Sequence, residues 1–397
     1  MDLKPRAASL PPPVTAACGA AVRPALDSSA ARQTHLDALR GLFLVLMTST
    51  HLPTWFGVPT SQSFGFVSAA EGFVFLSAYM AGLVYTRRAA RDGMAAMKRT
   101  FWKRTRLIYA CQVACLLFLF TVIAALDVKF EQPAATNLMS FYLQAPLTGL
   151  WTSLLMIYNP PLLDILPMYI TYMLVSPWVL AYALQRGWRL VLVSSVLLWA
   201  GAQLGLSRVI YDATVALTGL PVPFNETGAF ETFAWQLLWV LGMALGSYHA
   251  RVPIGERWPL PDWLGRAALL VVVTFIIWRF TTGLAPFPGE NPWNQIADKW
   301  HLAPLRLFNF LAWVAVLLHY GAWLTAHLPR IRPLEVMGSA SLLVFSAHLV
   351  IVLMALAVFG ESTPERPKWV DLAMFTFSVV AMYVVARVAN WKSQTVR

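Results

Sequence analysis

Charged residues are scarce in this chain. Asp, Glu, Lys and Arg make up 12% of its 397 residues, about half the share that is usual in a soluble domain. Only three cysteines occur, Cys18, Cys111 and Cys115, and their spacing matches neither a disulfide framework nor a zinc site. The composition therefore excludes a disulfide-stapled secreted domain, and we expect these cysteines to be inert packing residues.

Several sequence signatures are also missing. The chain has no Gly-rich phosphate loop, no HExxH and no GxSxG, so metal, serine-hydrolase and redox chemistry have no support. It has no basic soluble domain, so the net charge of +11 indicates cytoplasmic loops of a membrane protein rather than nucleic-acid binding. No internal repeat is visible, so an inverted-repeat transporter has no positive sequence support.

Long apolar runs dominate what is present, since 58% of the residues are hydrophobic. Ten runs have about the 20 residues that a membrane-spanning helix needs. We therefore predict an all-α polytopic membrane protein with about ten transmembrane helices. They cover residues 36–53, 64–86, 105–126, 162–184, 189–207, 231–249, 264–282, 304–326, 338–359 and 368–389.

The rest of the chain divides simply. Residues 1–34 are rich in Ala and Pro and are predicted to be a disordered cytoplasmic tail. Residues 35–390 form the membrane domain, and 391–397 form a second cytoplasmic tail. The apolar stretch 137–158 is interrupted by Pro146 and Gly149, so we interpret it as re-entrant or interfacial rather than as an eleventh span.

The basic segment between the second and third predicted spans sets the orientation. Residues 87–106 contain eight Lys and Arg, which places this segment in the cytoplasm by the positive-inside rule. Ten spans then put both termini in the cytoplasm. The long segments 127–161, 208–230 and 283–303 face the opposite side, where they are predicted to form a mouth over the bundle.

The stretch from His35 to Tyr85 contains the most informative polar residues. Arg40 and His51 lie eleven residues apart in the first span, so they share one helix face and are separated by about 16 Å. Charged groups in hydrocarbon cost roughly 2.5–3.5 kcal/mol each at mid-helix. Each therefore needs a partner or a function.

Two roles are open for each residue at the outward end of this stretch. His51 is either an interfacial histidine bound to water or a general base that takes a proton from a hydroxyl. Glu71 is either a carboxylate favoured by the helix dipole at a helix start or the group that orients His51. His348, near the middle of the ninth predicted span, is either a packed, hydrogen-bonded histidine or a second catalytic group.

Cations near the cytoplasm are equally open to two interpretations. Arg40 either pairs with Asp37 one turn away or contacts a phosphate or a substrate carboxylate. Arg99, Lys103 and Arg106 share a helix face, and they either reach for lipid headgroups or bind the phosphates of a nucleotide-type cofactor.

Six motifs of the chain together match a known family: HLDALRGLFLVLMTSTHLP, SAAEGFVFLSAYMAGLVY, DILPMYI, FAWQLLWVLGMALG, APLRLFNFLA and MGSASLLVFSAHLV. The chain resembles the OpgC family of membrane succinyltransferases, which modify osmoregulated periplasmic glucans and are similar in turn to the acyltransferase-three superfamily. In that superfamily, an arginine of the first helix is followed eleven residues later by a histidine, here Arg40 and His51. A basic pair at the start of the third span corresponds to Lys103 and Arg106, where lysine replaces the usual arginine.

The resemblance implies an O-acyltransferase of a bacterial inner membrane. It implies acyl-CoA, here succinyl-CoA, as a co-substrate on the cytoplasmic side and a periplasmic glucan as acceptor, with no permanently bound cofactor and no metal. We expect His51, Glu71 and His348 to be catalytic, and Arg40, Arg99, Lys103 and Arg106 to bind the donor. The alternatives are an O-acetyltransferase of another polysaccharide or lipid glycan, and a glycan or anion transporter.

Overall fold

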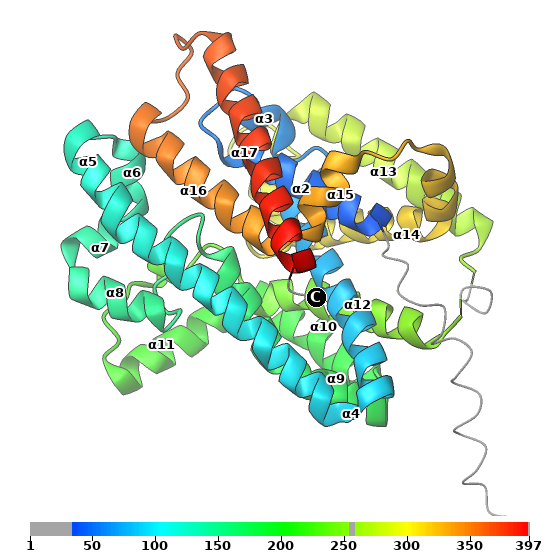
Figure 1. Ribbon diagram of the computed structural model, residues 1–397. Helices are drawn as coiled ribbons and strands as arrows, with labels where there is room; N and C mark the ends of the chain where they lie inside the picture. Colours follow the sequence, from blue (N-terminus) through cyan, green and yellow to red (C-terminus); the bar gives the residue numbers. More distant parts are fainter. Residues whose placement is uncertain (1–33, 254–258, 396–397) are drawn as a thin grey trace, which may run out of the picture.

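The computed structural model describes residues 34–253 and 259–395, and every regular element in these ranges is a helix (Figure 1). Apart from Thr34, the predicted tail 1–34 lies outside the described residues. The first half contains α2 (Thr34–His51), α3 (Gly57–Thr60), α4 (Ala69–Phe118), the π-helix η2 (Leu119–Ile123), α5 (Ala124–Phe130), α6 (Pro133–Leu138), α7 (Ser140–Gln144), α8 (Pro146–Leu154), α9 (Ile165–Arg186) and α10 (Arg189–Gln203). The second half contains α11 (Leu206–Thr218), η3 (Phe224–Glu226), α12 (Thr232–Arg251), α13 (Asp262–Thr282), η5 (Pro292–Ala297), α14 (Pro304–His327), α15 (Arg332–Ser339), α16 (Ser341–Phe359) and α17 (Lys368–Thr395).

All ten predicted apolar segments coincide with helices, which confirms the all-α class. Six helices of the described residues are long and apolar enough to cross a membrane, or seven if the bent pair α10 and α11 counts as one span. In that count the two arms of α4 are counted as one helix, and neither α2 nor α12 is among the six. About ten spans and cytoplasmic termini therefore stay predictions. Helix α17 continues beyond residue 390, where the predicted membrane domain ends.

Helix α4 is a hairpin rather than one straight rod. Gly93 adopts φ 83° and ψ 167°, which interrupts the helical geometry and which a residue with a Cβ rarely tolerates. The rings of Tyr85 and Phe101 stack with centroids 3.6 Å apart, whereas an unbroken helix would separate these residues by about 24 Å. The basic segment 87–106, predicted as the connection between two spans, is thus helical except at this one glycine.

The first arm of α4 lies against α12 at very short range. A Cβ on Gly82 would collide with the backbone of Met243, and a Cβ on Gly246 would collide with the backbone of Tyr79. Small residues let helix backbones approach in this way. α9 packs on the same long helix, so α4 stands at the centre of the bundle.

Other helices are broken where the sequence contains helix breakers. The stretch 137–158 forms parts of three short helices, and Pro146 begins α8, so the predicted interruption is confirmed. α10 and α11 meet at an angle of 77°, and Gly205 between them has a left-handed backbone. The ninth predicted span, 338–359, is also divided, between α15 and α16, but here the dividing residue is Ala340, which is not a helix breaker.

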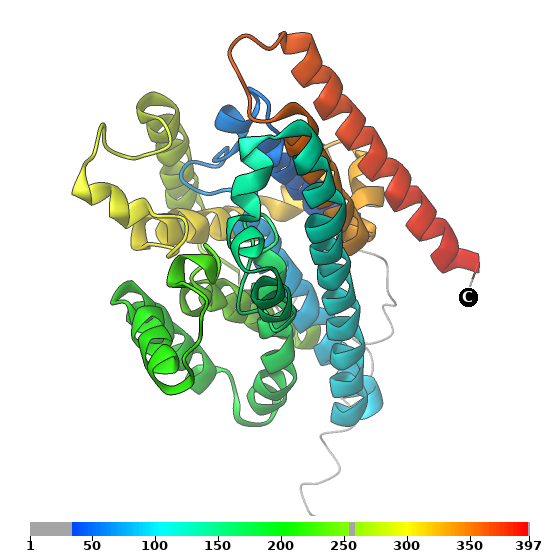
Figure 2. The same cartoon turned by 90° about the vertical axis from the view of Figure 1, so that its left-hand side faces the viewer.

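The basic hairpin of α4 and the His51 end of α2 lie at opposite ends of the bundle (Figure 1). The α4 turn at Gly93 lies at the lower edge of Figure 1, whereas α3 and the connection between α16 and α17 lie at the top, and Figure 2 shows the same separation from the side. His51 ends α2 immediately before the α3 segment. The basic hairpin and the His51 end of α2 therefore face opposite ends of the molecule.

Candidate functional site

Two histidines that are far apart in the sequence meet inside the bundle. Nδ1 of His51, the last residue of α2, lies 3.3 Å from Nε2 of His348 in α16. The rings are stacked, with centroids 5.5 Å apart and planes inclined by 25°. His348 is fully buried, while His51 is partly accessible. The structure thus brings together two of the predicted catalytic residues.

The contacts of this histidine pair fix its hydrogen atoms. His348 Nδ1 lies 2.6 Å from the backbone carbonyl of Phe345, and because a carbonyl only accepts, Nδ1 must carry the proton. In neutral His348, Nε2 is then an acceptor, so His51 donates to it through Nδ1. His51 is left with an unprotonated Nε2, which is the nitrogen a general base requires.

A second set of contacts holds the chain just after His51. Arg366 donates to the carbonyl of Pro53 at 2.7 Å, and the backbone N–H of Trp55 donates to Asp371 at 2.9 Å. Arg366 and Asp371 are themselves 3.7 Å apart and almost fully buried. Arg366 in the connection between α16 and α17, and Asp371 in the first turn of α17, therefore position the chain at the end of α2.

Arg40 lies at the other end of α2, beside a cavity of about 180 Å³. It donates to Ser341 Oγ at 2.6 Å and lies 3.9 Å from Asp37, so the predicted Asp37 pairing is present. Arg40, Ser77, Arg104 and Tyr169 line this cavity. They also line a smaller one of about 30 Å³ that reaches Phe345.

Phe345 joins the arginine cavity to the histidine pair. Its ring packs edge-on against His348 with centroids 4.7 Å apart, and its carbonyl accepts the His348 hydrogen bond. Phe345 thus lines the cavity next to Arg40 and also contacts His348 of the histidine pair. Along α2, the two ends of this arrangement are about 16 Å apart.

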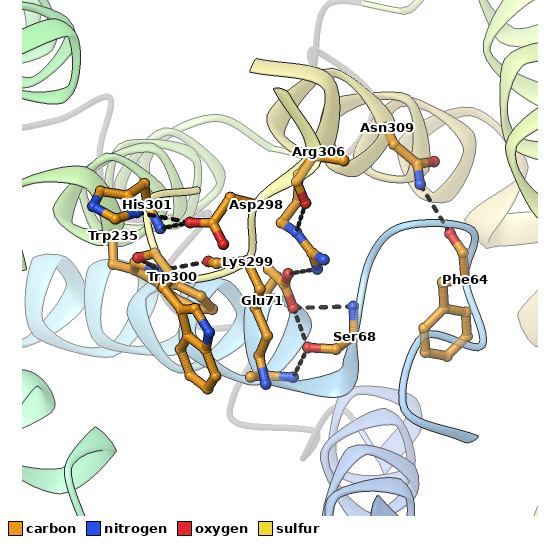
Figure 3. A network of polar contacts seen from close by, with 12 residues as sticks. Phe64, Ser68, Glu71, Trp235, Asp298, Lys299, Trp300, His301, Arg306 and Asn309 are labelled. Carbon is orange, nitrogen blue, oxygen red and sulfur yellow. Dashed lines mark hydrogen bonds and ion pairs between the residues drawn. The ribbon is translucent and has the colours of Figure 1, made fainter. Parts of the chain in front are cut away.

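Glu71 is placed differently from the prediction that it orients His51. Its carboxylate forms an ion pair of 2.6 Å with Arg306 and accepts bonds from the backbone N–H and the hydroxyl of Ser68, which caps α4 (Figure 3). Both Glu71 and Arg306 are buried. The alternative interpretation, a carboxylate at a helix start, describes this contact set, and His348 takes the place of Glu71 beside His51.

The three cations predicted to bind a cofactor lie together, but away from the cavity. Arg99, Lys103 and Arg106 are all exposed on the second arm of α4, whereas Arg104 lines both cavities. At about 100° per residue, Arg104 is about 60° from the buried Phe101, and the other three are on the opposite side of the helix. The spacing of the buried residues in this arm, Met97, Phe101, Thr105 and Ile108, is the signal that could have identified Arg104.

These features define a class: an all-helical membrane protein with a histidine pair inside the bundle, next to an arginine-lined cavity. Within the described ranges, no cluster of three or more His, Cys, Asp or Glu could hold a metal ion. The chain belongs to the OpgC family, because the family model for the OpgC protein matches residues 32–394, nearly its whole length. No curated protein and no solved structure matches it significantly. Family membership indicates an acyltransferase that acts on glucans.

Proposed function

We propose that this protein transfers a succinyl group from succinyl-CoA across a bacterial inner membrane to hydroxyl groups of periplasmic glucans. The observation that carries the proposal is the histidine pair, which leaves Nε2 of His51 as an unprotonated base. Family membership supports acyl transfer to a glucan. The succinyl donor and the periplasmic acceptor rest on the motifs shared with the OpgC family.

His51 acts first as a base and then as an acid. Nε2 takes the proton of a sugar hydroxyl while the hydroxyl oxygen attacks the thioester carbonyl carbon. The resulting imidazolium is stabilised through its Nδ1–H bond to His348. When the tetrahedral intermediate collapses, the carbon–sulfur bond breaks, and the thiolate takes the proton from His51, which restores the neutral pair.

Arg40 and Arg104 are the residues best placed to hold the donor. Both line the cavity that extends to Phe345, and guanidinium groups suit phosphate and carboxylate oxygens. The exposed cations Arg99, Lys103 and Arg106 on the same arm of α4 attract the phosphates of the donor to this end of the bundle. The pantetheine arm of the donor then has to extend only from the cavity at Arg40 to His51 at the other end of α2, because the cavity already enters the bundle.

The test is acyl substitution of glucans in a strain that lacks its own glucan acyltransferase. The wild-type chain should restore substitution, and His51→Ala should reduce the transfer rate by about 10²–10⁴-fold, the contribution of a general base. His327→Ala is the matched control, since His327 is exposed at the end of α14. Membrane expression is confirmed for each variant, and glucans are weighed by mass spectrometry. Full substitution by the His51 variant would remove it as the base.

The acetyltransferase alternative uses the same machinery, so the mass added to the glucan distinguishes it. A transporter would need broken helices in two symmetry-related halves. The described chain has one strongly bent pair, α10 and α11, so acyl transfer remains the function that the geometry supports best.

A further inference from the structure

Lys299 occupies a rigidly held position in the segment between η5 and α14. The indole N–H of Trp235 donates to the carbonyls of Trp300 at 3.0 Å and Lys299 at 3.3 Å. Trp199 donates to the carbonyl of Leu302 at 3.0 Å. These hydrogen bonds attach the backbone around Lys299 to α10 and α12, so they fix the position of its Cα.

The ammonium group of Lys299 is flanked by rings rather than by an anion. Nζ lies 4.6 Å from the ring centroid of Trp300 and 5.8 Å from that of Phe230. Among the residues that the structure describes, none forms an ion pair with this ammonium, and Figure 3 marks no contact at the end of this side chain. Burial lowers the pKa of Lys299, as expected for a cation that has lost water.

The carboxylates around Lys299 already have partners. Glu71 is paired with Arg306 at 2.6 Å, and Asp298 contacts His301 at 2.7 Å. Asp164 accepts the backbone N–H of Ala229 at 3.0 Å. Each of these carboxylates is close enough to influence Lys299 electrostatically, but none neutralises it by direct contact.

Lys299 also lies within electrostatic reach of His51. A partly desolvated ammonium near the proposed base, without a carboxylate of the protein on it, suits a carboxylate of the substrate. A succinyl group has such a carboxylate at the end opposite its thioester. An acetyl group has none.

We propose that Lys299 binds the free carboxylate of the acyl group and so makes the enzyme selective for a dicarboxylic donor. This inference rests on the proposed function, because it assigns specificity to the same site. Lys299 fixes the far end of the acyl chain while His51 and the sugar hydroxyl meet at the thioester carbon. The charge selects the donor and takes no part in bond making.

The experiment compares three donors with membranes that contain the full-length protein and a soluble glucan acceptor. The donors are succinyl-CoA, acetyl-CoA and the methyl ester of succinyl-CoA, and kcat/KM is measured for each. Wild type should prefer succinyl-CoA to its methyl ester by about ten- to a hundredfold, the effect of losing a charged hydrogen bond. Lys299→Met should lose this preference while keeping its rate with acetyl-CoA, and Lys299→Arg should retain much of the preference.

Lys368→Met is the matched control. Lys368 is exposed, and its Nζ lies 5.8 Å from the ring centroid of Trp55, so this substitution removes a similar cation–ring contact elsewhere and should leave the preference unchanged. Equal use of succinyl-CoA and its methyl ester by wild type overturns the inference without any variant. If Lys299→Met lowers kcat/KM for succinyl-CoA and for acetyl-CoA by the same factor, the inference is overturned as well. If wild type transfers no acyl group from any donor, the proposed function fails instead.

Discussion

The contact between His51 and His348 assigns different tasks to two chemically identical side chains. The Phe345 carbonyl fixes the hydrogen on His348, and His348 then fixes the hydrogen on His51. A carboxylate in the same position would pull the shared proton more strongly. A neutral imidazole instead orients His51 without adding a buried negative charge.

With His51 as the proposed base, His348 acts as a positioning residue, and we predict the effect of its loss on kcat and KM. His348→Ala removes the acceptor of the His51 bond and should lower kcat by about 10- to 100-fold with little change in KM, because His348 holds the base rather than the substrate. His348→Gln places an acceptor oxygen near the lost nitrogen and should recover part of the rate. Steady-state kinetics of the two variants with an acyl-CoA donor provide the measurement. A proportional rise in KM would show that His348 contacts the donor.

The sequence predicted individual residues better than their partners. His51 and His348 stand out because imidazoles are costly in apolar runs, but they are separated by 297 positions, and only the packing of α2 against α16 reveals the pair. Glu71 was predicted to orient His51. Its actual partner, Arg306, lies 235 positions away, a distance across which a single sequence gives no pairing signal.

At the scale of the helix, each of the ten hydrophobic runs in the sequence coincides with helices in the structure. A run of about 20 apolar residues predicts a helix well because few other structures can bury it. The rotation of a helix about its axis is harder to predict. On the second arm of α4, Lys103 and Arg106 were predicted to bind the donor, but they lie on the exposed face, and Arg104 is the residue that lines the cavity. The reversal between the second and third predicted spans is present as expected, but its form was not predicted: the connecting segment is helical on both sides of Gly93, and the turn depends on the backbone conformation of this one residue.

The contact between α4 and α12 provides a test at this scale. Gly246→Ala places a Cβ against the Tyr79 backbone and should lower the free energy of unfolding by about 1–3 kcal/mol, the cost of overpacking. Gly321→Ala is the matched control in α14, where a Cβ would meet no atom within 4 Å, and it should be neutral or slightly stabilising. Thermal unfolding in detergent measures both. Equal melting temperatures for the two variants would contradict the close packing.

For the whole molecule, the predicted orientation can be tested by chemical labelling. Thr363→Cys and Asp92→Cys replace exposed residues at opposite ends of the bundle, in a chain whose three native cysteines are changed to serine. A membrane-impermeant maleimide should label position 363 in intact spheroplasts, and position 92 only after permeabilisation, because the basic hairpin is expected to face the cytoplasm. The reverse pattern would invert the topology and separate His51 from a periplasmic acceptor.

The α4 hairpin has a consequence for how the protein enters its membrane. Its arms touch through Tyr85 and Phe101, which are close in sequence, and contacts between residues close in sequence form early because they close only a short loop. Both arms are therefore available as a preformed unit soon after they leave the ribosome, and the charges of the basic turn are expected to keep it in the cytoplasm. Later helices, α12 first among them, then assemble on a template that is already in place.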